Sequence, residues 1–265
     1  MRRDGAIGVF DSGIGGLTVL KELLARLPGE SFLYFGDTAR VPYGTKSPET
    51  ILRFSRENVT FLLDSKVKLI VVACNTASAE AVPRLQREFR IPIVGVIEPG
   101  VRAAVDASKN SRIGVIGTAG TIRSEAYQHG IKRLAKKAEV VARACPLFVP
   151  LVEEGWVDTQ VTEMVAEAYL GDFRDRDIDV LVLGCTHYPL LHGVIAKVMG
   201  DGVTLVDSAV ETTSEVERVL EAENLRKKNG KTEFTVYLSD IAPDFKRVGE
   251  RILGRKIPRI QLRSP

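Results

Sequence analysis

Residues 71–76 read Val-Val-Ala-Cys-Asn-Thr, and residues 182–187 read Val-Leu-Gly-Cys-Thr-His. Each stretch is an apolar run that ends in a cysteine followed by two polar residues. A second pair matches in the same way, because Ile-Gly-Val-Phe-Asp-Ser at 7–12 is similar to Ile-Gly-Val-Ile-Gly-Thr at 113–118. Turns of this kind lie at the carboxyl ends of parallel strands, where open α/β sheets bind ligands. The chain therefore contains a weak internal repeat, with one glycine-rich turn and one cysteine turn in each half.

Short apolar runs between the motifs predict the remaining strands. Runs that are nearly all apolar are typical of parallel strands covered by helices on both faces. Helical segments alternate with them, such as 14–27, whose leucines recur at helical spacing, and a helix opened by Ser47-Pro48. This alternation predicts an α/β fold with mainly parallel sheets flanked by helices. The predicted strands are Ala6–Phe10, Phe32–Phe35, Leu69–Ala73, Ile93–Val96, Ile113–Gly117, Val180–Leu183, Thr204–Val206 and Phe234–Leu238.

The repeat favours two pseudo-symmetric domains, with the active site in the cleft between them and one cysteine on each side. A single (β/α) barrel is the competing architecture. After residue 208 we expect a long helix, a turn at 227–231, a strand and a closing helix that return to the first domain. The predicted division is therefore 1–97 plus 208–265 for the Cys74 side and 98–207 for the Cys185 side.

The composition is typical of a soluble globular protein. The chain has 265 residues, of which 45% are hydrophobic, and its mean hydropathy is +0.02. A net charge of +3 is too small to indicate a nucleic-acid partner. Basic residues gather at 132–137 and 246–263, but no aromatic residues or binding motifs accompany them. We interpret both stretches as solvated faces and expect no nucleic-acid partner.

Neither a targeting signal nor a membrane segment is expected. Asp11 interrupts the first apolar run after a few residues, and no run is long enough to span a bilayer. We therefore expect a cytoplasmic protein with no membrane partner. Three cysteines without close spacing do not form a disulfide framework, so they remain thiols in a reducing compartment.

Cys74 and Cys185 are the candidate reactive groups. Each follows a predicted strand and precedes a helix, which we expect to begin near Ala77 and near Pro189. The positive end of a helix favours a thiolate, so we expect the pKa of both thiols to be lowered. Two buried structural cysteines are the alternative, but matching turns in two matching halves argue against it. Cys145 has apolar neighbours and no counterpart, so we interpret it as structural.

Polar residues follow both cysteines. Asn75 and Thr76 come after the first, and Thr186 and His187 come after the second. Short amide and hydroxyl side chains beside backbone N–H groups can hold a carboxylate or an ammonium group. His187, two residues from Cys185, can tune or polarise that thiol.

Three further segments carry candidate residues. The glycine-rich turn at 11–16 does not match G-x-G-x-x-G, because Thr18 stands at the last glycine position, and it has no Gly-Lys of a P-loop. Helix packing alone would explain its glycines, but not Asp11 at the end of an apolar strand. Residues 35–44 are rich in turn formers and predict a loop over the site. Glu153 and Glu154 follow an apolar run, and a solvated face explains them equally well.

These motifs together resemble those of glutamate racemases, in the aspartate/glutamate racemase superfamily. The resemblance lies in Val9–Gly16 (VFDSGIGG), Pro42–Gly44 (PYG), Ala73–Ala77 (ACNTA) and Gly184–Pro189 (GCTHYP). It continues through Gly117–Thr121 and Val206–Ala209, so it covers most of the chain. The two cysteine motifs in combination are highly specific.

The resemblance implies a two-domain enzyme that interconverts L- and D-glutamate without pyridoxal phosphate, metal or nucleotide. We therefore expect glutamate as the small-molecule substrate, no cofactor and no metal. It further implies that the enzyme supplies D-glutamate for peptidoglycan biosynthesis, and hence for cell wall biogenesis and cell shape. We also expect a homodimer.

The resemblance assigns roles to individual residues. The paired catalytic thiols correspond to Cys74 and Cys185, and the supporting catalytic residues to Asp11, Glu153 and His187. The implied substrate-binding residues are Asp11, Ser12, Pro42, Tyr43, Gly44, Asn75, Thr76, Thr186 and His187. Chemistry fits this assignment, because racemisation needs a base on one face of Cα and an acid on the other, and two opposed thiols supply both.

Four other functions compete with this one. An aspartate or hydantoin racemase of the same superfamily shares the cysteine pair but holds a different side chain. A cysteine-nucleophile hydrolase would use Cys185 and His187 and would not need Cys74. A two-domain binding protein has no use for two reactive thiols. A zinc site from Cys74, Cys185 and His187 lacks C-x-x-C spacing and a fourth ligand.

Overall fold

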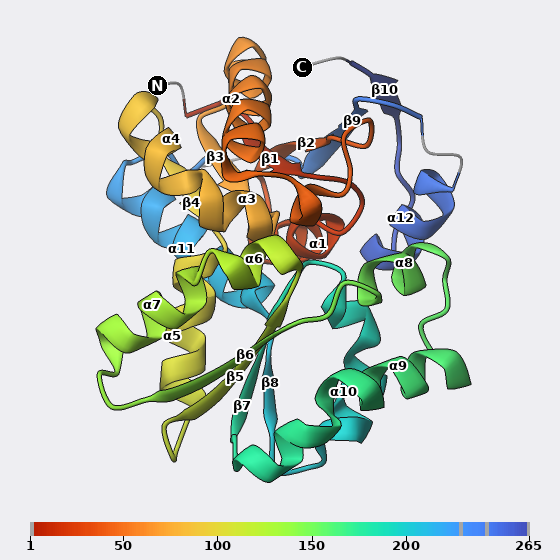
Figure 1. Ribbon diagram of the computed structural model, residues 1–265. Coiled ribbons are helices and arrows are strands. Elements are labelled where there is room, and N and C mark those ends of the chain that lie inside the picture. The colour runs from red at the N-terminus through yellow and green to blue at the C-terminus, as the bar shows by residue number, and fades with distance from the viewer. Residues whose placement is uncertain (1–2, 228–229, 242–243, 264–265) are drawn as a thin grey trace.

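The computed structural model describes residues 3–227, 230–241 and 244–263. Its strands form two separate sheets, and each sheet is flanked by helices, as Figure 1 shows with one sheet above the other. Every strand pairing in both sheets is parallel. The predicted α/β class with parallel sheets is therefore confirmed.

The larger sheet has six strands in the order β10-β9-β2-β1-β3-β4. Its strand β1 is buried along its whole length, as expected of a parallel strand covered on both faces. The bounds of its strands are β1 Ile7–Asp11, β2 Ser31–Gly36, β3 Leu69–Val72, β4 Ile93–Gly95, β9 Glu233–Leu238 and β10 Ile260–Leu262.

The smaller sheet has four strands in the order β6-β5-β7-β8. The larger sheet contains the run β2-β1-β3-β4, so the two sheets share one strand order when the strands of each are numbered along the chain from β1 and from β5. β1 corresponds to β5, and β3 before Cys74 corresponds to β7 before Cys185. The internal repeat seen in the sequence is thus a repeat of topology. The bounds are β5 Arg112–Gly117, β6 Glu139–Ala144, β7 Val180–Gly184 and β8 Thr204–Val206.

Helices cover both faces of each sheet. Leucines of α1 pack with α11 and α12 on one face of the larger sheet, and α2 and α4 cover the other face. On the smaller sheet, α8, α9 and α10 cover one face and α5 and α7 the other. The helices are α1 Leu17–Arg26, α2 Pro48–Asp64, α3 Asn75–Glu80, α4 Val82–Glu88, α5 Ile97–Ala107, α6 Ala119–Arg123, α7 Ala126–Leu134, α8 Phe148–Glu153, α9 Gln160–Leu170, α10 His192–Met199, α11 Ser208–Ala222 and α12 Phe245–Leu253, with short 3₁₀ turns at Tyr43–Thr45, Gly171–Arg176 and Tyr188–Leu191.

Local sequence explains where the first two helices begin. α2 starts at Pro48, and the Ser47 hydroxyl accepts a hydrogen bond from the backbone N–H of Thr50 at 3.3 Å, as predicted for an N-cap. α1 begins at Leu17 rather than at Ile14, because residues 14–16 form the glycine-rich turn. That turn leaves the end of β1 open toward the other sheet.

The C-terminal part returns to the larger sheet, where β9 pairs with β2. Part of the turn expected at 227–231 lies outside the described residues, because 228 and 229 are not among them. β6 and β10 were not predicted, and the closing helix α12 is followed by β10. The division into 1–97 plus 208–265 and 98–207 stays a proposal. The connection from β4 to α5 and the connection from β8 to α11 are the places where the chain passes between the sheets.

Candidate active site

The carboxyl ends of β1 and β3 face those of β5 and β7, and a small cavity lies between them. It has a volume of about 20 Å³, which is room for about one water molecule. Both candidate cysteines line it, one from each sheet. The lining residues are Ser12, Val41, Pro42, Tyr43, Gly44, Cys74, Asn75, Thr76, Thr118, Val149, Cys185, Thr186 and His187.

Cys74 follows β3 and is the N-cap residue of α3. Its Sγ lies 3.7 Å from Ser12 Oγ, and the backbone N–H of Ala77 is directed at the sulfur. Burial and, next, the nearby charge of Asp11 raise the pKa of the Cys74 thiol to about 12, although the hydrogen bonds from Ala77 and Ser12 act to lower it. The expectation of a lowered pKa at Cys74 was therefore wrong. α3 has only six residues, so its dipole does not offset desolvation and a neighbouring carboxylate.

Asp11 is the last residue of β1 and is fully buried. Its Oδ2 accepts a hydrogen bond from the Gly13 backbone N–H at 2.9 Å. Oδ1 has no hydrogen-bond partner within the described part of the chain. Burial raises the pKa of this carboxyl, while the charge of His187 lowers it in part. A buried carboxylate oxygen without a partner, next to a thiol, is available to an ammonium group.

Cys185 follows β7, and His187 lies beside it. The Nδ1 atom of His187 is 3.8 Å from Cys185 Sγ. Its Nε2 is 3.4 Å from Glu153 Oε1, close enough for an ion pair but not aligned for a hydrogen bond. Burial lowers the pKa of His187, but Cys185 and Glu153 outweigh burial and raise it to about 10. Glu153, the last residue of α8, is therefore the carboxylate that reaches the histidine, and not Glu154, the C-cap residue that follows it.

The loop at 41–44 lines the cavity, and the hydroxyl of its tyrosine is held by Asp37 and Asn58. Tyr43 donates a short hydrogen bond to Asp37 and accepts one from Asn58 Nδ2 at 3.1 Å. Arg40 Nε also binds Asp37, at 2.7 Å. Asp37 is fully buried, so this network fixes the loop and leaves the backbone around Gly44 facing the site.

Hydroxyl groups from both sides meet at one edge of the cavity. Thr76 Oγ1 lies 2.8 Å from Thr118 Oγ1 and 3.2 Å from Thr121 Oγ1. Asn75 is buried next to them, and its Oδ1 accepts a hydrogen bond from Tyr127 at 2.7 Å. Its Nδ2 is buried and finds no partner in any described residue. This group of donors and acceptors suits the binding of a carboxylate.

The two sides touch closely at glycines. A Cβ atom on Gly15 would lie 2.2 Å from Thr186 Oγ1 and 2.6 Å from His187 Nδ1. A Cβ atom on Gly44 would lie 2.6 Å from Thr118 Cβ. All three distances are far below contact distance, so both positions need glycine in the closed arrangement.

The structure brings the predicted site residues together, with Asp11 beneath the cavity and Glu153 behind His187. Sequence reasoning missed Thr118, Val149 and Tyr127. The repeat contained a signal for Thr118, because it occupies the place of Ser12 in the second half. Cys145 is fully buried and does not line the cavity; its Sγ lies 3.8 Å from the backbone oxygen of Arg143.

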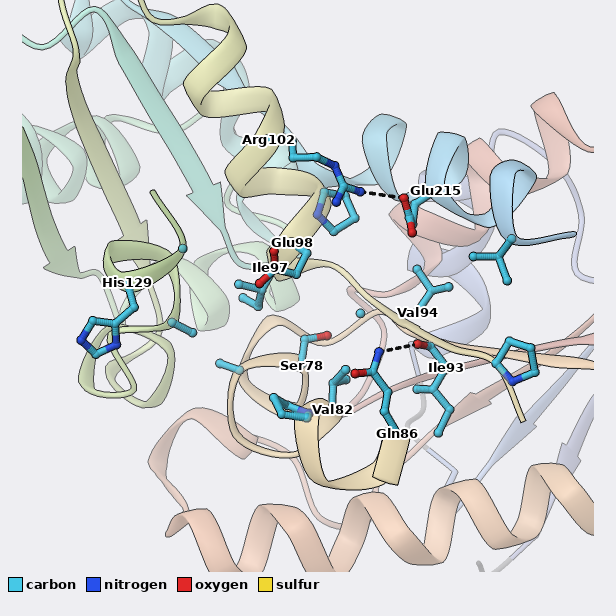
Figure 2. Close-up of a pocket in the computed structure, with 18 of the residues that line it drawn as sticks. Ser78, Val82, Gln86, Ile93, Val94, Ile97, Glu98, Arg102, His129 and Glu215 are labelled. Carbon is cyan, nitrogen blue, oxygen red and sulfur yellow. Dashed lines mark hydrogen bonds and ion pairs between the residues drawn. The ribbon is translucent and has the colours of Figure 1, made fainter. Parts of the chain in front are cut away.

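A larger cavity of about 870 Å³ lies elsewhere in the groove between the two sides, and Figure 2 shows it between α4, α5, α7 and α11. It is lined by apolar residues and by paired charges, such as Arg102 and Glu215 at 2.7 Å. Gln86 Nε2 donates to the backbone oxygen of Ile93 at 2.9 Å. No cysteine lines it, so thiol chemistry belongs to the smaller cavity.

Among residues 3–227, 230–241 and 244–263, no helix combines the length and the apolar character that crossing a membrane would require. Within the same ranges, no three His, Cys, Asp or Glu side chains gather closely enough to hold a metal ion.

Each of the two parallel sheets places one thiol on the shared cavity. This arrangement is the one expected of an enzyme that uses two opposed cysteines. Residues 7–216 match the Asp/Glu/Hydantoin racemase family. The glutamate racemase of Geobacter metallireducens is 56% identical over 253 residues, covering 95% of this chain and 94% of its own. The crystal structure of Francisella tularensis glutamate racemase in complex with D-glutamate has a TM-score of 0.93 at 40% identity, covering 99% of this chain and 98% of its own.

Another similar structure is that of Thermus thermophilus glutamate racemase in complex with β-chloro-D-alanine, with a TM-score of 0.90 at 46% identity, covering 100% of this chain and 98% of its own. The chain belongs to the Asp/Glu/Hydantoin racemase family and is an amino-acid racemase, an isomerase. The resemblance found in the sequence motifs is confirmed.

Proposed function

We propose that this racemase interconverts L- and D-glutamate by a two-base mechanism in which Cys74 and Cys185 act on opposite faces of Cα. The observation that carries the proposal is that the two thiols, from matching turns of two sheets, line one cavity. One thiolate removes the Cα proton and the other thiol returns a proton from the opposite face. Reversing the reaction needs only the opposite starting protonation state. The relatives that are named glutamate racemases support glutamate as the substrate.

On the Cys74 side, we assign abstraction of the proton from D-glutamate. The raised pKa of Cys74, to about 12, keeps this thiol protonated in the free enzyme at neutral pH. An α-ammonium group bound next to Cys74 and the unpartnered Oδ1 of Asp11 would bring a positive charge to both. That charge lowers the free energy of the thiolate relative to the thiol. Substrate binding would thus activate the base.

On the Cys185 side, we assign abstraction of the proton from L-glutamate. His187 holds a raised pKa of about 10, so it is an imidazolium at neutral pH, 3.8 Å from Cys185 Sγ. Glu153 lies at the opposite edge of the His187 ring, with Oε1 3.4 Å from Nε2. An imidazolium there attracts negative charge on the sulfur and orients the base, while Glu153 holds the ring in place.

The Cα proton of an amino acid is very weakly acidic, so the site must stabilise a carbanion-like state. The backbone at the start of α3, the Nδ2 group of Asn75 and the threonine hydroxyls supply donors for the α-carboxylate. The closed cavity of about 20 Å³ is too small for glutamate, so the two sides must separate for the substrate to bind. Closure then excludes water around the reacting carbon.

The proposal includes a role in the cell and an expected state of assembly. The product D-glutamate would serve peptidoglycan biosynthesis, and thereby cell wall biogenesis and cell shape. A homodimer remains our expectation for the assembly, and light scattering on the purified protein measures it.

The test of the activity is circular dichroism of L-glutamate, and separately D-glutamate, with purified protein and no added cofactor. We expect the ellipticity to decay to zero from either enantiomer, with aspartate turned over far more slowly. Activity should persist after dialysis against a chelator and a carbonyl-trapping reagent. A faster reaction with aspartate would assign a different substrate, and activity that only metal or pyridoxal phosphate restores would overturn the cofactor-independent mechanism.

A further inference from the structure

One buried tyrosine connects the two cysteine turns. Tyr127 lies on α7, which packs against the smaller sheet, and it is fully buried. Its hydroxyl donates to Asn75 Oδ1 at 2.7 Å, next to Cys74 on the other side of the cavity. Its ring packs against Gly184, the residue before Cys185, where an added Cβ would lie 3.1 Å from Tyr127 Cε2. A single side chain thus contacts the neighbour of each catalytic cysteine.

The phenol is the donor of this hydrogen bond. Ser208, the first residue of α11, lies near its hydroxyl, because a Cβ atom on Gly100 would lie 3.1 Å from the Tyr127 hydroxyl oxygen and 3.2 Å from Ser208 Cβ. Burial raises the pKa of Tyr127, so the phenol keeps its proton at the pH of any racemase assay. The single proton of the phenol is therefore available for a hydrogen bond, and Asn75 Oδ1 is its acceptor at 2.7 Å. Ser208 belongs to the Val206–Ala209 motif of the sequence, for which the reaction itself gives no role.

The consequence for Asn75 is a fixed amide orientation. An amide can flip and exchange its oxygen and nitrogen at little cost where nothing distinguishes the two. Here Oδ1 is held by Tyr127, so Nδ2 is the part of the amide left for a ligand; Asn75 lines the cavity, and Nδ2 is buried with no partner among the described residues. A buried N–H₂ group without a partner is costly unless a ligand accepts from it.

We propose that Tyr127 is a positioning residue for the substrate: its hydroxyl orients the Asn75 amide so that Nδ2 donates to a carboxylate oxygen of the bound amino acid. This inference rests on the proposed function, since it takes Asn75 as part of the glutamate site. Because Tyr127 comes from the side opposite Asn75, the amide is oriented only when the two sides are closed. Closure and carboxylate recognition are thereby coupled.

The test is Tyr127→Phe, which removes the hydroxyl and keeps the ring against Gly184. The carboxylate is already charged in the ground state, so loss of its oriented donor mainly weakens substrate binding and raises KM, while the extra charge that develops on it in the carbanion-like state adds a smaller fall in kcat. We expect KM for both enantiomers to rise about tenfold, with kcat within about threefold of the wild type. The Kd of D-glutamate from calorimetry should rise by the same factor. Tyr237→Phe, on β9 of the larger sheet and away from the cavity, is the matched control and should leave KM unchanged.

A role of Tyr127 in folding alone is separated by a double-mutant cycle with Asn75→Ala. We expect Asn75→Ala to raise KM and Tyr127→Phe to add little in that background, because the amide it orients is gone. The inference is overturned if Tyr127→Phe leaves KM within twofold, or if it raises KM equally in both backgrounds. If either result is found and the wild-type protein racemises glutamate, only the role of Tyr127 is refuted. Wild-type protein that does not racemise glutamate refutes the proposed function instead.

Discussion

Replacing Gly15 by alanine should block closure of the active site without unfolding the protein. The new Cβ would lie 2.2 Å from Thr186 Oγ1 and 2.6 Å from His187 Nδ1. The threonine side chain can rotate away, but His187 is held between Cys185 and Glu153 and cannot. Overpacking of this kind costs about 1–3 kcal/mol. Separation of the two sides relieves the contact, so the cost falls on the closed state alone.

A cost of about 2 kcal/mol lowers the population of the closed state about thirtyfold, and kcat/KM should fall by that factor in both directions. The assay is the initial rate of racemisation of each enantiomer by circular dichroism. Enantiomers have equal free energy in solution, so the two kcat/KM values must stay equal, which checks the assay. The melting temperature should change little, because the open form accommodates the methyl group.

The matched control is Gly193→Ala on α10, where an added Cβ meets nothing within 4 Å. This variant should keep the wild-type kcat/KM. If Gly15→Ala also keeps the wild-type kcat/KM, the reasoning is refuted, because the cavity would then have to work with the two sides apart. If it melts many degrees lower, the glycine serves the packing of its own side instead.

Two further predictions follow from the charges. Alkylation of Cys74 by iodoacetamide, measured by peptide mass spectrometry, should accelerate about tenfold per pH unit from pH 7 to 10. The reason is that the Cys74 pKa of about 12 lies above that range, so the thiolate fraction rises with pH. A plateau of the rate below pH 9 would contradict this, because it would show that the thiol ionises more easily. Fully buried Cys145 should react most slowly, and glutamate should protect Cys74 and Cys185. Lys68→Met should lower the free energy of unfolding by about 3–5 kcal/mol, because the Lys68 ammonium binds Glu30 at 2.6 Å inside the protein and its loss leaves a buried carboxylate. Arg112→Ala, at the exposed pair with Asp177, should lower the free energy of unfolding by less than about 1 kcal/mol. Urea titration measures both variants, and equal losses of stability in the two would contradict this difference.

The sheets and the position of the thiols could be predicted because their signals are local. Runs such as 69–72 are wholly apolar and buried on both faces, so periodicity identifies them without tertiary information. The likeness of 71–76 to 182–187 then places each cysteine after the same strand of a repeated topology. β6 was not predicted because it is a half-exposed edge strand that contains Arg143 and Glu139. β10 reads Ile-Gln-Leu, is polar at its centre and is not buried at any position, so it does not form an apolar run.

The electrostatics of the site could not be predicted, because they depend on neighbours that are distant in the chain. The sequence places Cys74 before a helix and thus favours a lowered pKa. The structure adds burial and the charge of Asp11, 63 residues earlier in the sequence, and these reverse the direction. Tyr127 was missed for the same reason, since nothing in residues 126–134 indicates a contact with Asn75. Only the structure distinguishes Glu153 from Glu154, because the turn of α8 directs Glu153 toward His187.

The two-base mechanism is tested most directly by elimination from a glutamate analogue that carries a leaving group at the β-carbon, such as β-hydroxyglutamate. Such an analogue eliminates after a single proton abstraction, so a variant with one thiolate can still react with the enantiomer that presents its proton to that side. Cys185→Ser should retain elimination mainly from the D-configured analogue, and Cys74→Ser mainly from the L-configured one, while neither variant racemises glutamate. A swapped preference would exchange the faces assigned to the two thiols. Equal loss of elimination from both configurations in either variant would contradict the mechanism and point to a single base.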